Sequence, residues 1–170
     1  MVMSDPTADP TLDRLLRHMA WANAALFARL AELPDSALAL ASPRNEWTVA
    51  MILEHLVMAA GGYAARLEGA PRPERTAPST TVAMLAELAT RCAASDARIR
   101  AQAARPDGPA GYSDRGTVLR ARSTILGQAT HHATEHRAQI AGALATNGID
   151  VLDLDALDVW AYGDAEGLGA

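Results

Sequence analysis

The chain has 170 residues and a formal net charge of −5, with 49% hydrophobic and 21% charged residues. This length suits one domain with a sizeable core, and the composition excludes a wholly disordered chain. The negative charge and the lack of basic runs argue against a nucleic-acid partner, because phosphate binding needs clustered cations.

The residue usage predicts a helical protein. There are 38 alanines, 15 arginines and no lysine, but only one phenylalanine, three tryptophans and three tyrosines. No apolar stretch reaches the ~20 residues of a membrane-spanning helix, and the N-terminus lacks the pattern of a secretory signal. Cys92 stands alone and cannot form an internal disulfide. We therefore expect a single domain over residues 1–170, flexible at residues 1–8, located in the cytoplasm.

The first predicted helix starts at Asp9-Pro10, because aspartate caps a helix N-terminus and proline suits its first turn. Pro34 ends it. Its apolar residues recur at steps of three and four: Leu12, Leu15, Leu16, Met19, Leu26, Leu30 and Leu33.

The second predicted helix starts after Thr48, which serves as its N-cap, and runs toward Gly69. Its apolar residues lie on nearly all sides, which favours a helix covered by neighbouring helices or by a second subunit. The third is expected from about Ser79 to Ala104, with an apolar stripe that includes Cys92.

The fourth predicted helix runs from about Thr117 to Thr146 and ends at Asn147-Gly148. In the acidic tail after it, aspartates are expected to cap a short helix that docks on the bundle through Leu154, Leu157 and Trp160. No segment shows convincing strand alternation. The predicted fold is an all-α four-helix bundle with long inter-helix connections and a short C-terminal docking segment.

Three of the five histidines lie in the fourth predicted helix. A rotation of about 100° per residue places His132 about 40° from His136 and places His131 about 140° away. His132 and His136 therefore share the apolar face, with the i, i+4 spacing that lets two imidazoles reach one metal ion. A hydrogen-bonded surface pair without metal is the alternative interpretation of this spacing.

His55 lies among apolar residues of the second predicted helix, so it can supply a third imidazole inside the bundle. Three buried imidazoles without partners would leave ring nitrogens unsatisfied, and a divalent ion would satisfy them. Three histidine ligands with a fourth position open are typical of catalytic metal sites, whereas closed four-ligand sites are structural.

The remaining histidines and the cysteine receive structural interpretations. His18 is predicted to be a partly exposed structural residue, and His131 to face solvent or a subunit contact. Cys92 is predicted to act as a small buried apolar side chain without a reactive thiolate.

Several polar residues stand close to the predicted ligands. Glu54 and Glu135 each precede one directly, about 100° around the helix, so we expect solvation, with an indirect contact to a ligand as the alternative. Arg137 and Gln139 can bind a substrate carboxylate or a water, or form an ion pair and a surface amide. Asn23 is expected to form hydrogen bonds inside the bundle.

Four segments of the chain form a specific combination: LLRHMAWAN at 15–23, EWTVAMILEHL at 46–56, HATEHRAQI at 132–140 and LDVWAYG at 157–163. Together they resemble the DinB-like family of four-helix-bundle metal-binding proteins. The chain departs from the family pattern at Ala138, where relatives have glycine, and at Glu135, where they often have histidine. Neither change removes a ligand.

The resemblance implies that His55, His132 and His136 form a metal triad, with zinc or nickel as the usual metal and a homodimer as the usual assembly. Relatives include enzymes that use the low-molecular-weight thiols bacillithiol or mycothiol and proteins proposed as metal-dependent hydrolases. A fold of this kind hosts different chemistries, so the resemblance alone does not choose among them.

The function expected first is that of a metalloenzyme whose bound ion activates a low-molecular-weight thiol for S-transfer or isomerisation. The second is a hydrolase in which the ion lowers the pKa of water from 15.7 toward ~7. The third is a non-catalytic, metal-stabilised bundle that binds a small molecule. The catalytic residues beyond the ligands stay unassigned.

Overall fold

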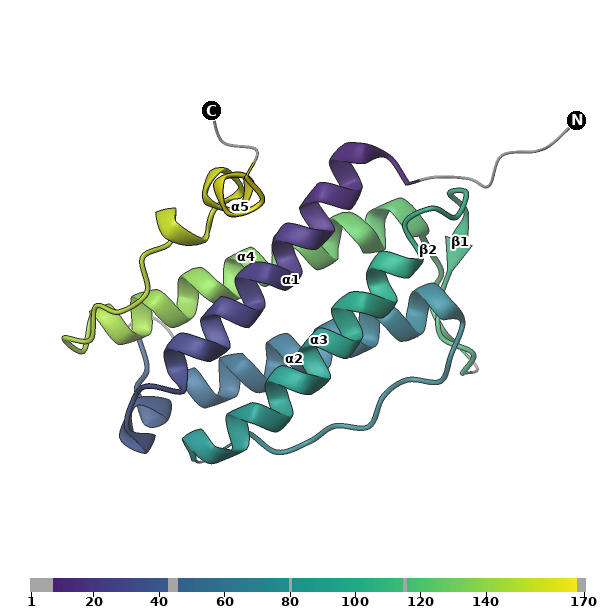
Figure 1. Cartoon of the computed structure of the whole chain (residues 1–170). Coiled ribbons are helices and arrows are strands. Elements are labelled where there is room, and N and C mark those ends of the chain that lie inside the picture. The colour runs from purple at the N-terminus through teal and green to yellow at the C-terminus, as the bar shows by residue number, and fades with distance from the viewer. Residues whose placement is uncertain (1–7, 43–45, 80, 115, 168–170) are drawn as a thin grey trace, which may run out of the picture.

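Four long helices form the bundle that the sequence predicts (Figure 1). The computed structural model describes residues 8–42, 46–79, 81–114 and 116–167. The long helices are α1 (Pro10–Leu30), α2 (Val49–Glu68), α3 (Leu85–Ala101) and α4 (Arg122–Ala145). α1 packs on α3 and α4, and α2 packs on the same two helices. The all-α prediction is confirmed. Of residues 1–8, which are predicted to be flexible, residues 1–7 lie outside the described residues.

The helix ends follow the capping residues of the sequence. The Asp9 side chain accepts hydrogen bonds from the backbone N–H groups of Thr11 and Leu12, and that of Thr48 accepts one from Met51. Gly69 ends α2 in the left-handed conformation, with φ 69°, where a side chain would be strained. The predicted starts of α1 and α2 are therefore confirmed.

The connection between α2 and α3 runs back along the length of the bundle, so α3 begins at the end where α2 begins (Figure 1). It is one of the long inter-helix connections that the sequence predicts. The connection between α1 and α2 contains a short 3-10 turn, Asp35–Ala39, and an isolated bridge between Ala41 and Thr48. Among the described residues, no helix combines the length and apolar character that membrane crossing requires.

The predicted starts of the third and fourth helices are wrong. A 3-10 turn, Val82–Met84, precedes α3, and α4 begins only at Arg122. Before α4, β2 (Arg120–Ala121) pairs antiparallel with β1 (Pro109–Ala110), in a part of the chain where no strand was predicted. Strands of two residues are too short to show alternation, so the sequence carries no periodic signal for them.

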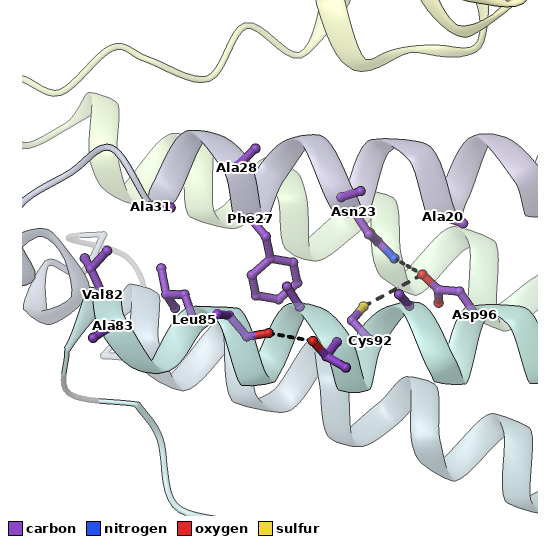
Figure 2. A pocket seen from close by; sticks show the side chains of 15 residues that line it. Ala20, Asn23, Phe27, Ala28, Ala31, Val82, Ala83, Leu85, Cys92 and Asp96 are labelled. Carbon is purple, nitrogen blue, oxygen red and sulfur yellow. Dashed lines mark hydrogen bonds between the residues drawn. The ribbon is translucent and has the colours of Figure 1, made fainter.

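A polar network joins three helices inside the bundle, and Figure 2 shows the part of it between Asn23 and Asp96. The Asn23 amide of α1 donates to Asp96 Oδ2 of α3 at 3.0 Å, and Arg137 Nη1 of α4 donates to Asn23 Oδ1 at 2.8 Å. Asn23 therefore forms the internal hydrogen bonds that were predicted. Burial lowers the pKa of Arg137 to about 10 and raises the pKa of Asp96 to about 6.

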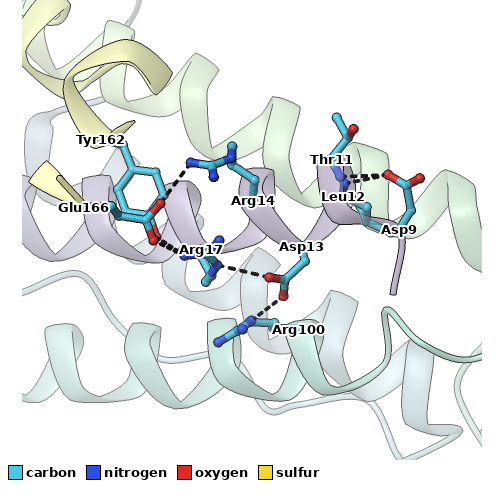
Figure 3. A network of polar contacts seen from close by, with 9 residues as sticks. All are labelled: Asp9, Thr11, Leu12, Asp13, Arg14, Arg17, Arg100, Tyr162 and Glu166. Carbon is cyan, nitrogen blue, oxygen red and sulfur yellow. Dashed lines mark hydrogen bonds and ion pairs between the residues drawn. The ribbon is translucent and has the colours of Figure 1, made fainter. Parts of the chain in front are cut away.

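The C-terminal segment docks on α1 through polar contacts (Figure 3). Asp158 caps α5 (Val159–Ala165) by accepting from the Ala161 N–H at 2.8 Å, as predicted for the tail aspartates. Glu166, just after α5, pairs with Arg14 and Arg17 of α1. These contacts hold the short helix against the bundle.

Two predictions about this docking are wrong. Trp160 is 85% exposed and Leu154 is 40% exposed, whereas Tyr162 is buried and its hydroxyl accepts from Arg17 Nη1 at 3.0 Å. His18 is buried and not partly exposed. The C-terminal tail lies over it, and its Nε2 forms a hydrogen bond of 2.8 Å with the carbonyl oxygen of Leu157 in that tail. Trp160 and Tyr162 are two residues apart, about 200° around α5, so only one of the two rings can face the bundle.

Candidate metal centre

Three histidines from two packed helices come together between α2 and α4. His55 comes from α2, and His132 and His136 come from successive turns of α4. His132 Nε2 lies 3.2 Å from His55 Nε2 and 3.0 Å from His136 Nε2. One ligand nitrogen of each residue lies within 4.8 Å of the others. His131 is exposed on another face of α4, as the helical rotation predicts.

The donor set fits a divalent ion. His136 Nδ1 donates to Gln139 Oε1 at 2.7 Å, so the neutral His136 ring has its lone pair on Nε2, facing the other two rings. The three Nε2 atoms lie next to one another, and His136 Nε2 carries no proton in this form. A proton on one Nε2 atom can form a hydrogen bond to only one of the other two, so the three atoms cannot all be paired by hydrogen bonds among themselves. Around zinc, tetrahedral nitrogens at 2.0–2.1 Å are separated by about 3.4 Å. The observed Nε2–Nε2 distances of 3.0 and 3.2 Å are close to that separation.

The surroundings keep two of these rings neutral. Burial lowers the pKa of His132 to about 4, with further lowering from His136, His55 and His131. Burial also lowers the pKa of His55, as do the charges of His136 and Arg75. Metal binding requires the neutral imidazole, so these shifts favour binding at neutral pH.

The lowered pKa of His132 predicts how the metal-free protein responds to acid. The folded state holds fewer protons than the unfolded state between the unfolded pKa of about 6.5 and the folded pKa of about 4. The free energy of unfolding should therefore fall as the pH drops through this window. Urea unfolding of the metal-free protein at a series of pH values measures this slope. His132→Gln should flatten it and His131→Gln should not; an equal slope in all three proteins would contradict the assignment.

An open hollow borders the three histidines. It has a volume of about 360 Å³ and is lined by the three histidines together with Trp47, Glu135 and Gln139. The Trp47 ring packs edge-on against His55, with ring centres 5.0 Å apart. Glu135 is exposed, in agreement with its predicted solvation. The hollow gives a small molecule access to the point where the three Nε2 atoms converge.

Tyr63 belongs to the site although the sequence analysis did not single it out. Its ring packs edge-on against His132 across the α2–α4 interface, at 5.7 Å between ring centres. Burial raises the pKa of its hydroxyl. Helical rotation relates residues within one helix, so a contact between two helices gave no signal in the sequence.

Two charged residues next to the ligands do not have the predicted environment. Glu54 is buried and not solvated: it accepts a hydrogen bond from Thr76 of the α2–α3 connection, and Arg91 lies 3.7 Å away. Burial raises the pKa of Glu54. Arg137 is only 3% exposed and points into the interhelical network, so it does not flank the hollow. Neither side chain lines the hollow.

Cys92 has the structural role predicted for it. It is buried in the core on α3, and its pKa is raised by burial and by the neighbouring carboxyl of Asp96. A thiol in this environment stays protonated at neutral pH and is not nucleophilic. The site therefore does not use the chain's own cysteine.

Gln139 fixes the orientation of His136, which predicts an effect on metal affinity. Gln139→Leu removes the acceptor of the Nδ1 proton and should weaken metal binding by roughly 10–100-fold. Competition against a chromophoric chelator measures this affinity. Glu135→Gln is the matched control, because Glu135 lines the same hollow and makes no contact with a ligand ring through a hydrogen bond among the described residues. Equal affinity of Gln139→Leu and the native protein would contradict this role.

Comparisons with known proteins agree with this fold. The model of the DinB family matches residues 3–163. The crystal structure of a DinB-like protein from Bacillus cereus superposes with a TM-score of 0.63 at 15% sequence identity, covering 82% of this chain and 94% of that one. At this identity the likeness concerns the fold alone. A search of curated proteins finds no match.

Proposed function

Because the chain belongs to the DinB family, we propose that it is a metalloenzyme in which His55, His132 and His136 hold a catalytic divalent ion. The observation that carries this proposal is the convergence of three Nε2 atoms beneath an open hollow. A structural metal site would be closed by a fourth protein ligand. Among the described residues, the group of potential ligands contains these three histidines and no cysteine, aspartate or glutamate.

The proposed ion is zinc or nickel, since imidazole nitrogen suits both metals. An ion bound by three neutral histidines would supply a positive charge that lowers the pKa of a thiol or a water molecule beside it. The proposed nucleophile is a low-molecular-weight thiol of the bacillithiol or mycothiol type, used in S-transfer or isomerisation. The buried, protonated Cys92 supports a thiol that comes from outside the chain.

The residues around the three histidines have distinct roles in this proposal. Trp47 and Tyr63 hold the His55 and His132 rings by edge-on packing, and Gln139 holds the His136 ring by its hydrogen bond. Glu135 offers the one carboxylate among the residues that line the hollow and is the candidate for proton transfer. The chain thus positions the ligands and leaves one side open to substrate.

Competition at the metal of the cobalt-substituted protein tests the proposal. Sub-millimolar low-molecular-weight thiols should shift the visible spectrum, because sulfur would enter the coordination sphere of the cobalt. A response only to acetate-like anions would favour the hydrolase. No response to either would favour a non-catalytic bundle that binds metal for stability. The cobalt form of His131→Ala should respond like the native protein.

We also propose a cytoplasmic homodimer. Within one chain, α3 and α4 bury most of the apolar face of α2, so this face does not need a second subunit to cover it. The C-terminal tail is the surface that we propose for the dimer contact. Exposed apolar side chains gather there: Val151, Leu154, Val159 and Trp160. Sedimentation should give a species of twice the chain mass of 17.9 kDa, and a species of one chain mass would contradict the dimer.

A further inference from the structure

The hollow beside the histidine triad is lined by one carboxylate and by no arginine. Its lining consists of the three histidines together with Trp47, Gln139 and Glu135. Imidazoles must be neutral to bind a metal, and the side chains of Trp47 and Gln139 carry no charge. A molecule that approaches the ligand nitrogens through the hollow therefore passes a single charged side chain, that of Glu135.

Glu135 lies at the edge of the face of α4 that carries the two ligands. It is about 60° around the helix from His132 and about 100° from His136. Its charge acts on Tyr63, whose ring packs against His132: burial raises the pKa of the Tyr63 hydroxyl, and the charge of Glu135 raises it further. The carboxylate is thus next to the site without belonging to the group of potential metal ligands.

No cation of the described residues neutralises this carboxylate. Glu135 is exposed, and none of the ion pairs among the described residues includes it. Arg137, two residues later in the same helix, is buried and points into the interhelical network. Burial lowers the pKa of His55 and the charge of Arg75 lowers it further, but Arg75 is not among the residues that line the hollow. The charge of Glu135 is therefore available to a bound molecule.

Trp47 favours the same kind of molecule. Its side chain is 38% exposed and lines the hollow, and its ring centre lies 5.0 Å from that of His55. The π electrons of an indole attract a cation and do not attract an anion. A carboxylate and an indole in one hollow therefore both select positive charge.

On the basis of the proposed thiol chemistry, we propose that the thiol used at this site carries an ammonium group close to its sulfur and that Glu135 binds this group. The sulfur would lie where the three Nε2 atoms converge, and the ammonium would reach the carboxylate within the same hollow of about 360 Å³. A cysteinyl group with a free amine has this pattern. Acylation of the amine would remove its charge, and a carboxylate in its place would be repelled by Glu135.

Three thiols with the same two-carbon linker test this selection: cysteamine, 2-mercaptoethanol and 3-mercaptopropionate, which end in an ammonium, a hydroxyl and a carboxylate. Each is titrated at pH 7.5 into the cobalt-substituted protein, and its affinity is measured from the visible spectrum. Glu135→Gln should lower the ratio of the cysteamine affinity to the 2-mercaptoethanol affinity about three- to fivefold, the size of an exposed ion pair. Comparing this ratio between two proteins cancels differences in thiol acidity and any binding of the amine to cobalt.

Two further variants locate the effect. Glu135→Lys should reverse the preference, so that 3-mercaptopropionate binds more tightly than cysteamine. Glu87→Gln is the matched control, because it removes an exposed carboxylate of α3 that does not line the hollow, and it should keep the native ratio. An unchanged ratio in Glu135→Gln, or an equal fall in Glu87→Gln, would overturn the inference.

The same titrations separate this inference from the thiol proposal on which it rests. If Glu135 served in proton transfer alone, Glu135→Gln would weaken all three thiols alike and keep the ratio, which would overturn the binding of an ammonium. Spectral responses to every thiol with one ratio in both proteins would overturn the inference and leave the thiol proposal standing. No response to any of the three would overturn the thiol proposal, and this inference with it.

Discussion

His132→Ala should reduce the metal content of the purified protein from about one ion per chain to nearly none. His132 is the central member of the triad, since its Nε2 lies within 3.2 Å of the Nε2 atoms of both His55 and His136. Its loss leaves two imidazoles on different helices, too few for a tetrahedral site of the usual three or four protein ligands. His55→Ala and His136→Ala should cause comparable losses, measured by elemental analysis after dialysis.

His131→Ala is the matched control for this experiment. It removes the neighbouring imidazole from the same helix, but His131 is exposed and lies outside the group of potential ligands. Its metal content should equal that of the native protein. A comparable loss of metal in His131→Ala would show that the wrong face of α4 had been assigned to the metal.

Arg137→Met should lower the free energy of unfolding by about 3–5 kcal/mol, the usual effect of leaving a buried charge without its compensating opposite charge. Arg137 is 3% exposed and donates to Asn23 and to Thr134, at 2.8 and 2.9 Å. Its removal leaves Asn23 Oδ1 without its donor and removes the positive charge that acts on the Asp96 carboxylate across Asn23. Urea unfolding at pH 8, with metal removed from both proteins, measures the difference.

Arg29→Met is the control for Arg137→Met, since it removes the same charge from the surface. The Arg29 side chain is 62% exposed and lies 3.7 Å from Glu32. Exposed pairs of this kind contribute about 0–1 kcal/mol. A loss below 1 kcal/mol in Arg137→Met would mean that the buried network does not stabilise the fold.

The sequence predicted those features of the site that depend on position along one helix. Rotation of about 100° per residue placed His132 and His136 on one face and His131 on another, and the structure has this arrangement. The caps at Asp9 and Thr48 also predicted where α1 and α2 begin, because a capping hydrogen bond joins residues that are close together in the chain.

Features that depend on contacts between segments were predicted less well. Glu54 was expected in solvent, but the connection between α2 and α3 covers it and supplies Thr76 as its partner. Arg137 was expected near the ligands, but its side chain is buried and donates a hydrogen bond to Asn23 inside the bundle. Neither the path of a long connection nor the partner of a buried cation is encoded in helical spacing.

The direct test is a crystal of the zinc-soaked protein, with an anomalous difference map recorded at the zinc absorption edge. The account predicts one strong peak between α2 and α4, about 2.0–2.1 Å from Nε2 of His55, His132 and His136, with no fourth protein ligand. A map without a peak at this position, or a peak closed off by another side chain, would contradict the account.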